Sequence, residues 1–266
     1  ITTVSGNDAS VAMAVAATGS LTTWLDLMNA NAADLGMKDT HFGSPNGFPD
    51  GGQTYTSARD LAMLGKAITQ RYPQLYRRYF GHRTMRWRDI TQANHDPVTG
   101  RVDGADGLKT GYTREAGFTF LGSAKRDGRR LVMVLAGSPD GRLRDSTSRD
   151  LLEWGFDAFE QETVIPQGAR VGEALVQDGV EMSVNLVPAK PVVINRPRGQ
   201  KGKSVAMEIV YRGPVQAPIE AGDEIARLRL SLDGDLALEV PLNAAETIPK
   251  ANAFQRISNA WRKWTA

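Results

Sequence analysis

The chain has 266 residues, 41% of them hydrophobic, which is enough to bury a full core and leaves room for two domains. Its formal net charge is only +2 and its sequence pI about 8.9. Because this balance is small and we identify no basic cluster interleaved with aromatic residues, we expect no nucleic-acid partner. The absence of cysteine excludes disulfides, thiolate catalysis and cysteine-ligated zinc. No hydrophobic run approaches the roughly 20 residues that a membrane-spanning helix needs.

Helix-like and strand-like segments alternate over the first 160 residues. Residues 9–35 are rich in Ala, Leu and Met at helical spacing, and residues 57–68 predict another helix, with Thr56 or Ser57 as its N-cap. Between them, residues 40–54 contain many glycines and prolines. They predict a long irregular loop, and a loop of this length in a compact domain is usually functional or disordered.

A hairpin and a helix are predicted next. Residues 118–124 and 130–136 are strand-like, and Asp127-Gly128 between them suits a tight turn. Residues 143–159 predict a helix with apolar side chains available for a core. These side chains are Leu151, Leu152, Trp154, Phe156 and Phe159.

The sequence changes in character after Thr163. Short alternating segments such as 206–211 and 224–230 are separated by Pro and Gly, which is typical of a small antiparallel β domain. The end of the chain breaks this pattern and predicts a helix. We therefore divide the chain into residues 1–162, a β-rich domain at 163–248 and a helix at 249–266.

Lys109-Thr110-Gly111 is one of three short motifs that identify serine enzymes acting on penicillin-like substrates. On an edge strand beside a cleft, the lysine can hold a carboxylate or tune a proton-transfer group. The threonine hydroxyl can donate to a carboxylate, and the glycine lets a substrate backbone approach closely. The hairpin that follows supports an edge position. The alternative is a chance tripeptide, with odds of roughly 5% in a chain of this length.

The second motif, Ser-x-Asn, is present as Ser5-Gly6-Asn7. Its serine can relay protons and its asparagine can bind a substrate carbonyl, but both residues also favour helix or loop starts. The third motif, Ser-x-x-Lys, carries the nucleophile, and no serine in this chain has a lysine three residues later. The sequence therefore contains two of the three motifs.

With these motifs, the chain resembles a D-alanyl-D-alanine carboxypeptidase, a low-molecular-mass penicillin-binding protein of the serine peptidases. The segments that carry the resemblance are Ser5–Ala9, Met28-Asn29, Leu35–Met37, Ser57–Ala62, Asp103-Gly104, Lys109–Thr113 and Leu151–Phe156. The resemblance is strong up to about residue 160 and looser beyond it. It implies a partial α/β (α+β) transpeptidase-like, penicillin-binding domain, a small all-β C-terminal domain and a terminal amphipathic helix.

The resemblance also implies roles for the motif residues. Ser5 and Asn7 would act in proton relay and in binding the substrate amide. Lys109, Thr110 and Gly111 would line the cleft on a strand, with the lysine among the catalytic groups and the other two binding substrate.

Arg144 matches the family arginine that helps to hold the terminal carboxylate of the substrate, with Arg142 as a nearby rival and a surface cation as the alternative interpretation. One departure concerns the Asp103-to-Lys109 spacing, which is longer than we expect and leaves the register of this strand open. The other is the absent nucleophile. Because the chain begins four residues before the second motif, we expect a fragment or processed form.

The function that the resemblance implies is a serine-type D-Ala-D-Ala carboxypeptidase of cell-wall maturation, with an acyl-serine intermediate, no cofactor and inhibition by β-lactams. It would remove the terminal D-alanine from peptidoglycan pentapeptides. The nucleophile would come from the missing N-terminal segment, as a cleaved fragment or a second chain, so we expect this chain alone to be inactive. The alternatives are a β-lactamase of the same fold, which needs a positioned deacylating water, and a non-catalytic peptidoglycan-binding or scaffolding module.

Neither the histidines nor the acidic residues predict a metal site. His41, His82 and His95 lack the i, i+4 spacing of a helical metal site, and no His-Glu-x-x-His occurs. The Asp103 to Asp106 cluster lacks the calcium-loop pattern and its final glutamate.

The end of the chain predicts a basic amphipathic helix. Phe254, Ile257, Trp261 and Trp264 recur at three- and four-residue spacing, and the basic side chains lie elsewhere on the wheel. Such a helix lies in a membrane surface or docks on the β domain. The resemblance favours the former, so we expect a periplasmic protein attached peripherally to the bacterial inner membrane.

Overall fold

The computed structural model describes residues 1–199, 205–232 and 235–255. The chain forms two compact units, Ile1–Asp157 and Ala158–Ala266, which we describe separately. The division falls five residues before the boundary at 162 predicted from the sequence, so the strand at Phe159–Ile165 belongs to the second unit.

The first unit combines five helices and five strands in its described residues. The helices are α1 (Asn7–Thr18), α2 (Leu21–Asp34), α3 (Ala58–Arg71), α4 (Pro73–Tyr79) and α5 (Gly141–Ala158). The strands are β1 (Thr84–Trp87), β2 (Ile90–Ala93), β3 (Ala105–Thr113), β4 (Gly117–Arg126) and β5 (Arg129–Ser138). Helix α4 and the β1–β2 hairpin were not predicted from the sequence.

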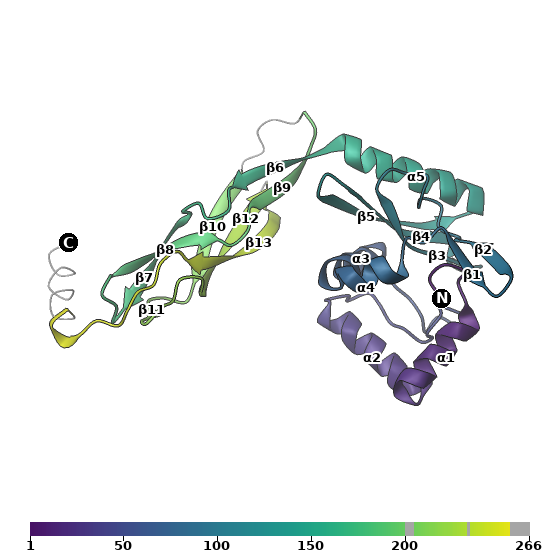
Figure 1. Cartoon of the computed structure of the whole chain (residues 1–266), viewed down its shortest axis with the longest axis horizontal. Helices are drawn as coiled ribbons and strands as arrows, with labels where there is room; N and C mark the ends of the chain where they lie inside the picture. The colour runs from purple at the N-terminus through teal and green to yellow at the C-terminus, as the bar shows by residue number, and fades with distance from the viewer. Residues whose placement is uncertain (200–204, 233–234, 256–266) are drawn as a thin grey trace. The chain divides into compact units, whose positions relative to one another are not determined.

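An antiparallel sheet in the order β3-β4-β5 lies between two layers of helices (Figure 1). Because side chains alternate along a strand, Phe120 packs with Leu152 and Phe156 of α5. Its neighbour Leu121 packs on the opposite face, near Tyr76 of α4. The sheet thus buries both faces, and β3 forms one of its edges.

The predicted hairpin between β4 and β5 is confirmed. Asp127 and Gly128 both have positive φ angles, 48° and 82°, as a two-residue type I′ turn requires. The helix that follows, α5, buries Leu152 and Phe156 as expected. Trp154 is a correction, because 55% of this residue is exposed: it lies on the outer side of the helix, between the buried positions.

The helical run predicted at 9–35 is divided into α1 and α2, bent by 91°. Gly19 ends α1 with a φ of 82°, and the Ser20 hydroxyl then accepts a hydrogen bond from the backbone N–H of Thr23, which caps α2. Ser57, rather than Thr56, caps α3 by accepting from the N–H of Asp60. Among the described residues, no single helix is long and apolar enough to cross a membrane.

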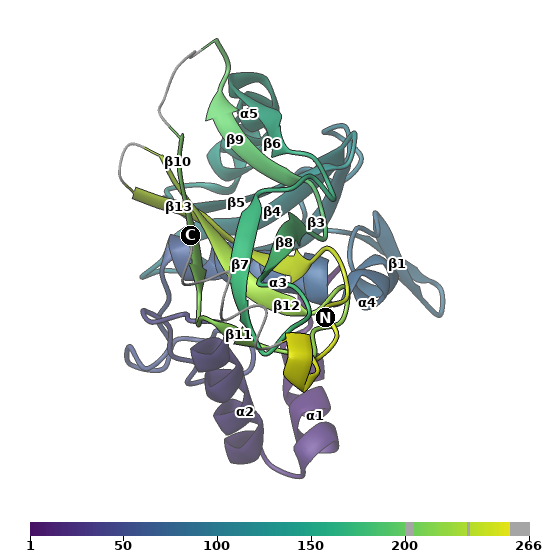
Figure 2. The same cartoon turned by 90° about the vertical axis from the view of Figure 1, so that its left-hand side faces the viewer.

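The second unit is the small β domain that the sequence predicts. Its strands are β6 (Phe159–Ile165), β7 (Gly172–Gln177), β8 (Ser183–Pro188), β9 (Val192–Pro197), β10 (Val205–Tyr211), β11 (Val215–Gln216), β12 (Glu224–Leu232) and β13 (Asp235–Ala244). They form a six-stranded sheet in the order β10-β12-β13-β8-β7-β11 and a separate β6-β9 pair (Figure 2). Aliphatic side chains such as Leu186, Leu228 and Leu242 fill the core.

A helical turn begins the predicted tail. Residues 253–255 are helical, and Asn252 and Gln255 form a capping box, each side chain accepting from the other residue's backbone N–H at 2.9 Å. The rest of the predicted tail helix, 256–266, lies outside the described residues, as do Ile257, Trp261 and Trp264 of its apolar face.

Candidate functional site

Two of the predicted motifs meet in the structure, although they lie 104 residues apart in the sequence. Lys109, on the edge strand β3, donates from Nζ to the Oγ atom of Ser5 at 2.8 Å and to the carbonyl oxygen of Thr110 at 2.7 Å. All three residues are half-buried. The serine and the lysine that we expected to share one site are therefore in direct contact.

A turn just before α1 presents Ser5. Its φ angle is 56°, in the left-handed region that residues with a Cβ atom rarely adopt, at a cost of about 1 kcal/mol or more. Gly6 is the N-cap of α1 and Asn7 is its first residue. Asn7 is exposed, and its side chain makes no hydrogen bond to Ser5 or Lys109 within the described residues. The structure thus brings Ser5, but not Asn7, into contact with the lysine.

The environment of Lys109 disfavours its charged form. Burial lowers the pKa of its amine, and the nearby positive charge of Arg144 lowers this pKa further. A neutral amine accepts a proton, whereas an ammonium group only donates. Lys109 is therefore better suited than an exposed lysine to exchange a proton with the hydroxyl of Ser5.

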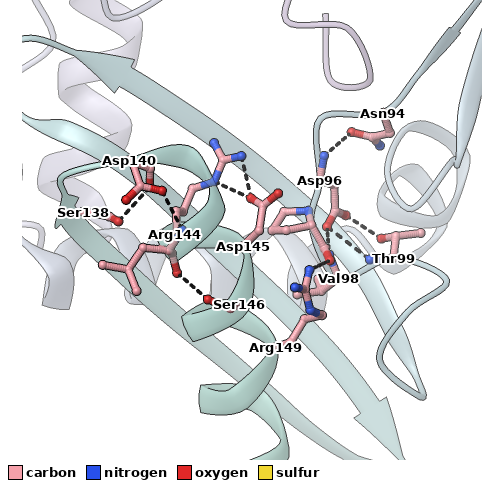
Figure 3. Close-up of polar contacts among 12 residues, drawn as sticks. Asn94, Asp96, Val98, Thr99, Ser138, Asp140, Arg144, Asp145, Ser146 and Arg149 are labelled. Carbon is pink, nitrogen blue, oxygen red and sulfur yellow. Dashed lines mark hydrogen bonds and ion pairs between the residues drawn. The ribbon is translucent and has the colours of Figure 1, made fainter.

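Arg144 lies in the first turn of α5, a position that Asp140 fixes by accepting a hydrogen bond from the backbone N–H of Leu143 at 2.9 Å (Figure 3). The guanidinium group donates from Nε and Nη2 to one oxygen of Asp145, at 2.9 and 2.7 Å. Only 13% of the Arg144 side chain is exposed. Arg142, its rival in the sequence, is exposed. Arg144 is the arginine whose charge acts on Lys109.

Aromatic side chains connect the motif strand to this arginine. Tyr112 packs against Phe118 of β4 in a tilted arrangement, with 4.3 Å between the ring centroids, and the Arg144 guanidinium lies over the Phe118 ring at 5.8 Å. A Cβ atom at Gly111 would meet the Oγ1 atom of Thr119 at 2.6 Å. A larger residue at this position of the motif would therefore force the Thr119 side chain to move.

A loop before β3 is tied to the same helix. Asp96 is buried, and its carboxylate accepts from the backbone N–H groups of Val98 and Thr99 and from the Thr99 hydroxyl (Figure 3). Arg149 of α5 donates to the carbonyl oxygen of Pro97 at 3.4 Å. These contacts hold the segment that leads into β3.

A partly buried polar network at the start of β3 was not predicted from the sequence. The Tyr76 hydroxyl donates to the backbone oxygen and to Oδ1 of Asp106, at 2.8 and 2.9 Å. Arg130 of β5 makes two parallel hydrogen bonds to the same carboxylate, at 2.8 and 2.7 Å, and also contacts Ser123. Burial, and secondly the charge of Asp106, raise the pKa of Tyr76, so its hydroxyl stays a donor.

This network resolves the register that the sequence left open. Asp103 is 91% exposed at its side chain, whereas Asp106 is held by Arg130 and Tyr76. The ladder between β3 and β4 has one irregularity, between Ala105 and Gly107, and is then regular through Lys109. The Asp-Gly pair at 106–107, rather than the pair at 103–104, is therefore the one that anchors the motif strand.

Metal-binding side chains do not gather in the part of the chain that the structure describes, where no group of three or more His, Asp or Glu residues lies in suitable positions. The ring nitrogens of His41 and His82 pair with the carbonyl oxygens of Gln53 and Arg78.

Comparison with known families matches both units. Residues 1–140 match the model of the D-alanyl-D-alanine carboxypeptidase family, and residues 159–250 match the model described as penicillin-binding protein 5, C-terminal domain.

Curated relatives match along nearly the whole chain. The D-alanyl-D-alanine carboxypeptidase DacF of Bacillus subtilis is 30% identical over 270 residues, covering 100% of this chain and 69% of the relative. DacA of Escherichia coli K12 is 32% identical over 254 residues, covering 95% of this chain and 62% of the relative. The chain thus spans about two thirds of the length of these relatives.

Solved structures share the fold. Penicillin-binding protein 5 from Haemophilus influenzae superposes with a TM-score of 0.75 at 30% identity, covering 94% of this chain and 72% of that one. Penicillin-binding protein D2 from Listeria monocytogenes, in an ampicillin-bound form, gives a TM-score of 0.54 at 28% identity, covering 58% of this chain and 64% of that one.

Proposed function

Because the chain belongs to the D-alanyl-D-alanine carboxypeptidase family, we propose that the protein is a serine-type carboxypeptidase that removes the terminal D-alanine from peptidoglycan pentapeptides. β-Lactams would inhibit it by acylating the nucleophilic serine of the Ser-x-x-Lys motif. The observation that carries the proposal is the contact between Lys109 Nζ and Ser5 Oγ at 2.8 Å, which joins two motifs of the family.

The geometry supports a division of roles. The nucleophilic serine attacks the carbonyl carbon of the penultimate D-alanine and gives up its hydroxyl proton, the peptide C–N bond breaks, and the departing amine takes up one proton. Ser5 and Lys109 are suited to deliver this proton, since the lysine has a lowered pKa and contacts the hydroxyl. Water then hydrolyses the acyl-serine ester. Thr110 and Arg144 would hold the terminal carboxylate of the substrate.

The nucleophile itself is proposed to come from outside these 266 residues, because none of their serines begins a Ser-x-x-Lys motif. A further segment of the protein, joined to this chain, cleaved from it or present as a second chain, would supply that serine and its lysine. Without it, the site described above can position a substrate but cannot form an acyl-enzyme.

The location is proposed from the tail. The capping box at Asn252 and Gln255 starts a helical turn at residues 253–255, and the sequence from Phe254 to Trp264 has the apolar spacing that predicts a basic amphipathic helix. Such a helix would attach the protein peripherally to the periplasmic face of the inner membrane. We expect the protein to sediment with anionic lipid vesicles, and we expect this binding to be lost when residues 253–266 are deleted.

The test of the function is release of D-alanine from a soluble pentapeptide ending in D-Ala-D-Ala by the full-length protein that its gene encodes. We expect release by the wild type, with a loss of about 100-fold or more in K109A and S5A, since general acid–base groups contribute about that much. K125A, which removes an exposed lysine from β4, is the matched control and should retain activity.

Two outcomes would contradict the proposal. One is full activity in K109A. The other is rapid turnover of penicillin to its hydrolysed product without D-alanine release, which would identify a β-lactamase.

A further inference from the structure

A strongly basic surface surrounds the β1–β2 hairpin. Residues 71–101 contain seven arginines and two aspartates, a net charge of +5, although the whole chain carries only +2. The exposed residues that define this basic surface are Arg77, Arg78, Arg83, Arg86, Arg88, Arg101 and Trp87. The small net charge of the whole chain averages this segment with acidic ones elsewhere. The sequence therefore does contain a basic cluster interleaved with aromatic residues, contrary to our interpretation of it, whereas the absence of a nucleic-acid partner stays a prediction.

The arginines of the basic surface are not neutralised by the chain itself. Within the described residues, none of these six guanidinium groups has a carboxylate at ion-pair distance, whereas Arg126, Arg130 and Arg144 are each paired. Of the two aspartates in the segment, Asp96 is buried and bonded within its own loop. Only Asp89, at the hairpin turn, is exposed. The positive charge of the surface is therefore available to an external anion.

The shape of the region also suits a ligand. A surface hollow of about 430 Å³ is lined by Gly81, Arg83 and residues 99–105, including Arg101 and the exposed Asp103. Beside it the hairpin projects from the first unit in both views (Figure 1 and Figure 2). At its tip 68% of Trp87 is exposed, between two arginines. Arginine and tryptophan are the residue types that binding surfaces favour.

The basic surface adjoins the candidate active site. The Thr2 hydroxyl donates to the carbonyl oxygen of Tyr79 at 2.6 Å, so α4 lies beside the segment that leads to Ser5. Ala105, at the edge of the hollow, is four positions before Lys109 on β3. At about 3.3 Å per residue this is ~13 Å, which four or five residues of an extended peptide span.

We propose that the basic surface binds carboxylates of the peptidoglycan strand whose peptide terminus occupies the site at Ser5 and Lys109. The proposal rests on the proposed function, because it requires the peptide terminus to bind at Ser5 and Lys109. A polymer that carries carboxylates along its length can reach this site and the basic surface at once. Arginine is suited to this role, since its planar group binds a carboxylate through two parallel hydrogen bonds. The surface would thus favour polymeric over small soluble substrates.

The test compares two variants of the full-length protein that remove three positive charges each. They are R83Q/R86Q/R88Q in the basic surface and R59Q/R170Q/R212Q at exposed positions elsewhere. Binding to purified peptidoglycan sacculi is measured by sedimentation at low and high salt, with single-stranded DNA and anionic lipid vesicles as competing probes. Sacculi whose carboxyl groups have been converted to amides form a further arm. Labelling by a fluorescent penicillin and D-alanine release from a soluble pentapeptide are measured on the same samples.

We expect the basic-surface variant to bind sacculi about tenfold more weakly at low salt, while the control binds like the wild type. The wild-type protein should no longer bind sacculi whose carboxyl groups have been amidated. Penicillin labelling and soluble-peptide activity should stay unchanged in both variants. Equal binding by the basic-surface variant, undiminished binding to amidated sacculi, a preference of the wild type for DNA, or a loss of vesicle binding in the basic-surface variant, which retains the tail, would each overturn the proposal. Failure of penicillin labelling in the wild type would instead count against the proposed function, and it is read separately from the binding.

Discussion

The two units of the chain are held together in different ways. The second unit buries a continuous core of aliphatic side chains, among them Leu186, Leu228 and Leu242, each 0% exposed. The described residues of the first unit form two smaller apolar clusters, and its motif strand depends on polar contacts through Asp106 and Lys109. Apolar packing therefore decides whether the β domain is folded, while hydrogen bonds and ion pairs decide where the site residues lie.

Helices α1 and α2 extend this contrast. Their described residues bury little apolar surface: Ser10, Ala14 and Ala32 are buried, whereas Met13 and Leu27 are 47% and 48% exposed. These two helices gain little stability from packing against the described part of the chain.

The largest effect should come from the core of the second unit. Leu228→Ala removes a fully buried side chain and should cost about 2–5 kcal/mol of unfolding free energy, because the cavity collapses only in part. Urea unfolding followed by circular dichroism measures it, and Leu175→Ala, at a position 57% exposed, is the control. A similar small loss in both variants would contradict the view that packing holds this unit.

The polar network of the first unit comes next. Asp106→Asn removes the charge that pairs with Arg130 and should destabilise this unit by about 1.5–3 kcal/mol, the range for hydrogen bonds to charged groups. Asp103→Asn is the control, since that side chain is 91% exposed. Thermal unfolding that resolves the two units should show a lower unfolding temperature for the first unit only. If neither unfolding temperature changes, the network does not stabilise the first unit.

A third change concerns the charge beside Lys109. Because the positive charge of Arg144 disfavours the ammonium form, Arg144→Gln should raise the pKa of Lys109, and the lysine should stay protonated to higher pH. NMR titration of the lysine Cε resonance measures this shift, with Arg142→Gln as the exposed control. A fall in the pKa, or an equal rise in the control, would show that Arg144 is not the neighbouring charge.

The smallest effect is expected at the ion pair between Arg126 and Glu153. Two hydrogen bonds at 2.8 Å lower the pKa of Glu153, so its stabilisation is present above pH 4.5 and is lost as the pH falls further. Because the Glu153 side chain is 46% exposed, solvent screening leaves only a few tenths of a kcal/mol. Glu153→Gln should therefore flatten the acid limb of the stability curve slightly, and Glu115→Gln, at an exposed position, is the matched control. A loss of several kcal/mol would contradict this estimate.

Local features of the fold were predictable from the sequence, whereas tertiary polar contacts were not. The Asp127-Gly128 turn and the Ser57 cap follow from preferences of adjacent residues. The link between Tyr76 and Asp106 joins residues 30 positions apart, and no local pattern reports it. Trp154 illustrates the same limit, because helical spacing fixes the face it lies on but not which face is buried.

The candidate site was likewise predictable in its local motifs but not in its tertiary contacts. The motifs located Ser5 and Lys109 separately, and only the fold brings them to 2.8 Å. The basic surface was overlooked because the net charge of the whole chain conceals a local excess of arginine.

The most direct test of the proposed division of labour is the mass of the full-length protein after reaction with a penicillin, followed by mapping of the modified peptide. We predict one covalent adduct, on the serine of a Ser-x-x-Lys segment outside these 266 residues, and no adduct on the 266-residue chain alone. An adduct on Ser5, or on any other serine of this chain, would contradict the assignment of Ser5 and Lys109 as assisting groups.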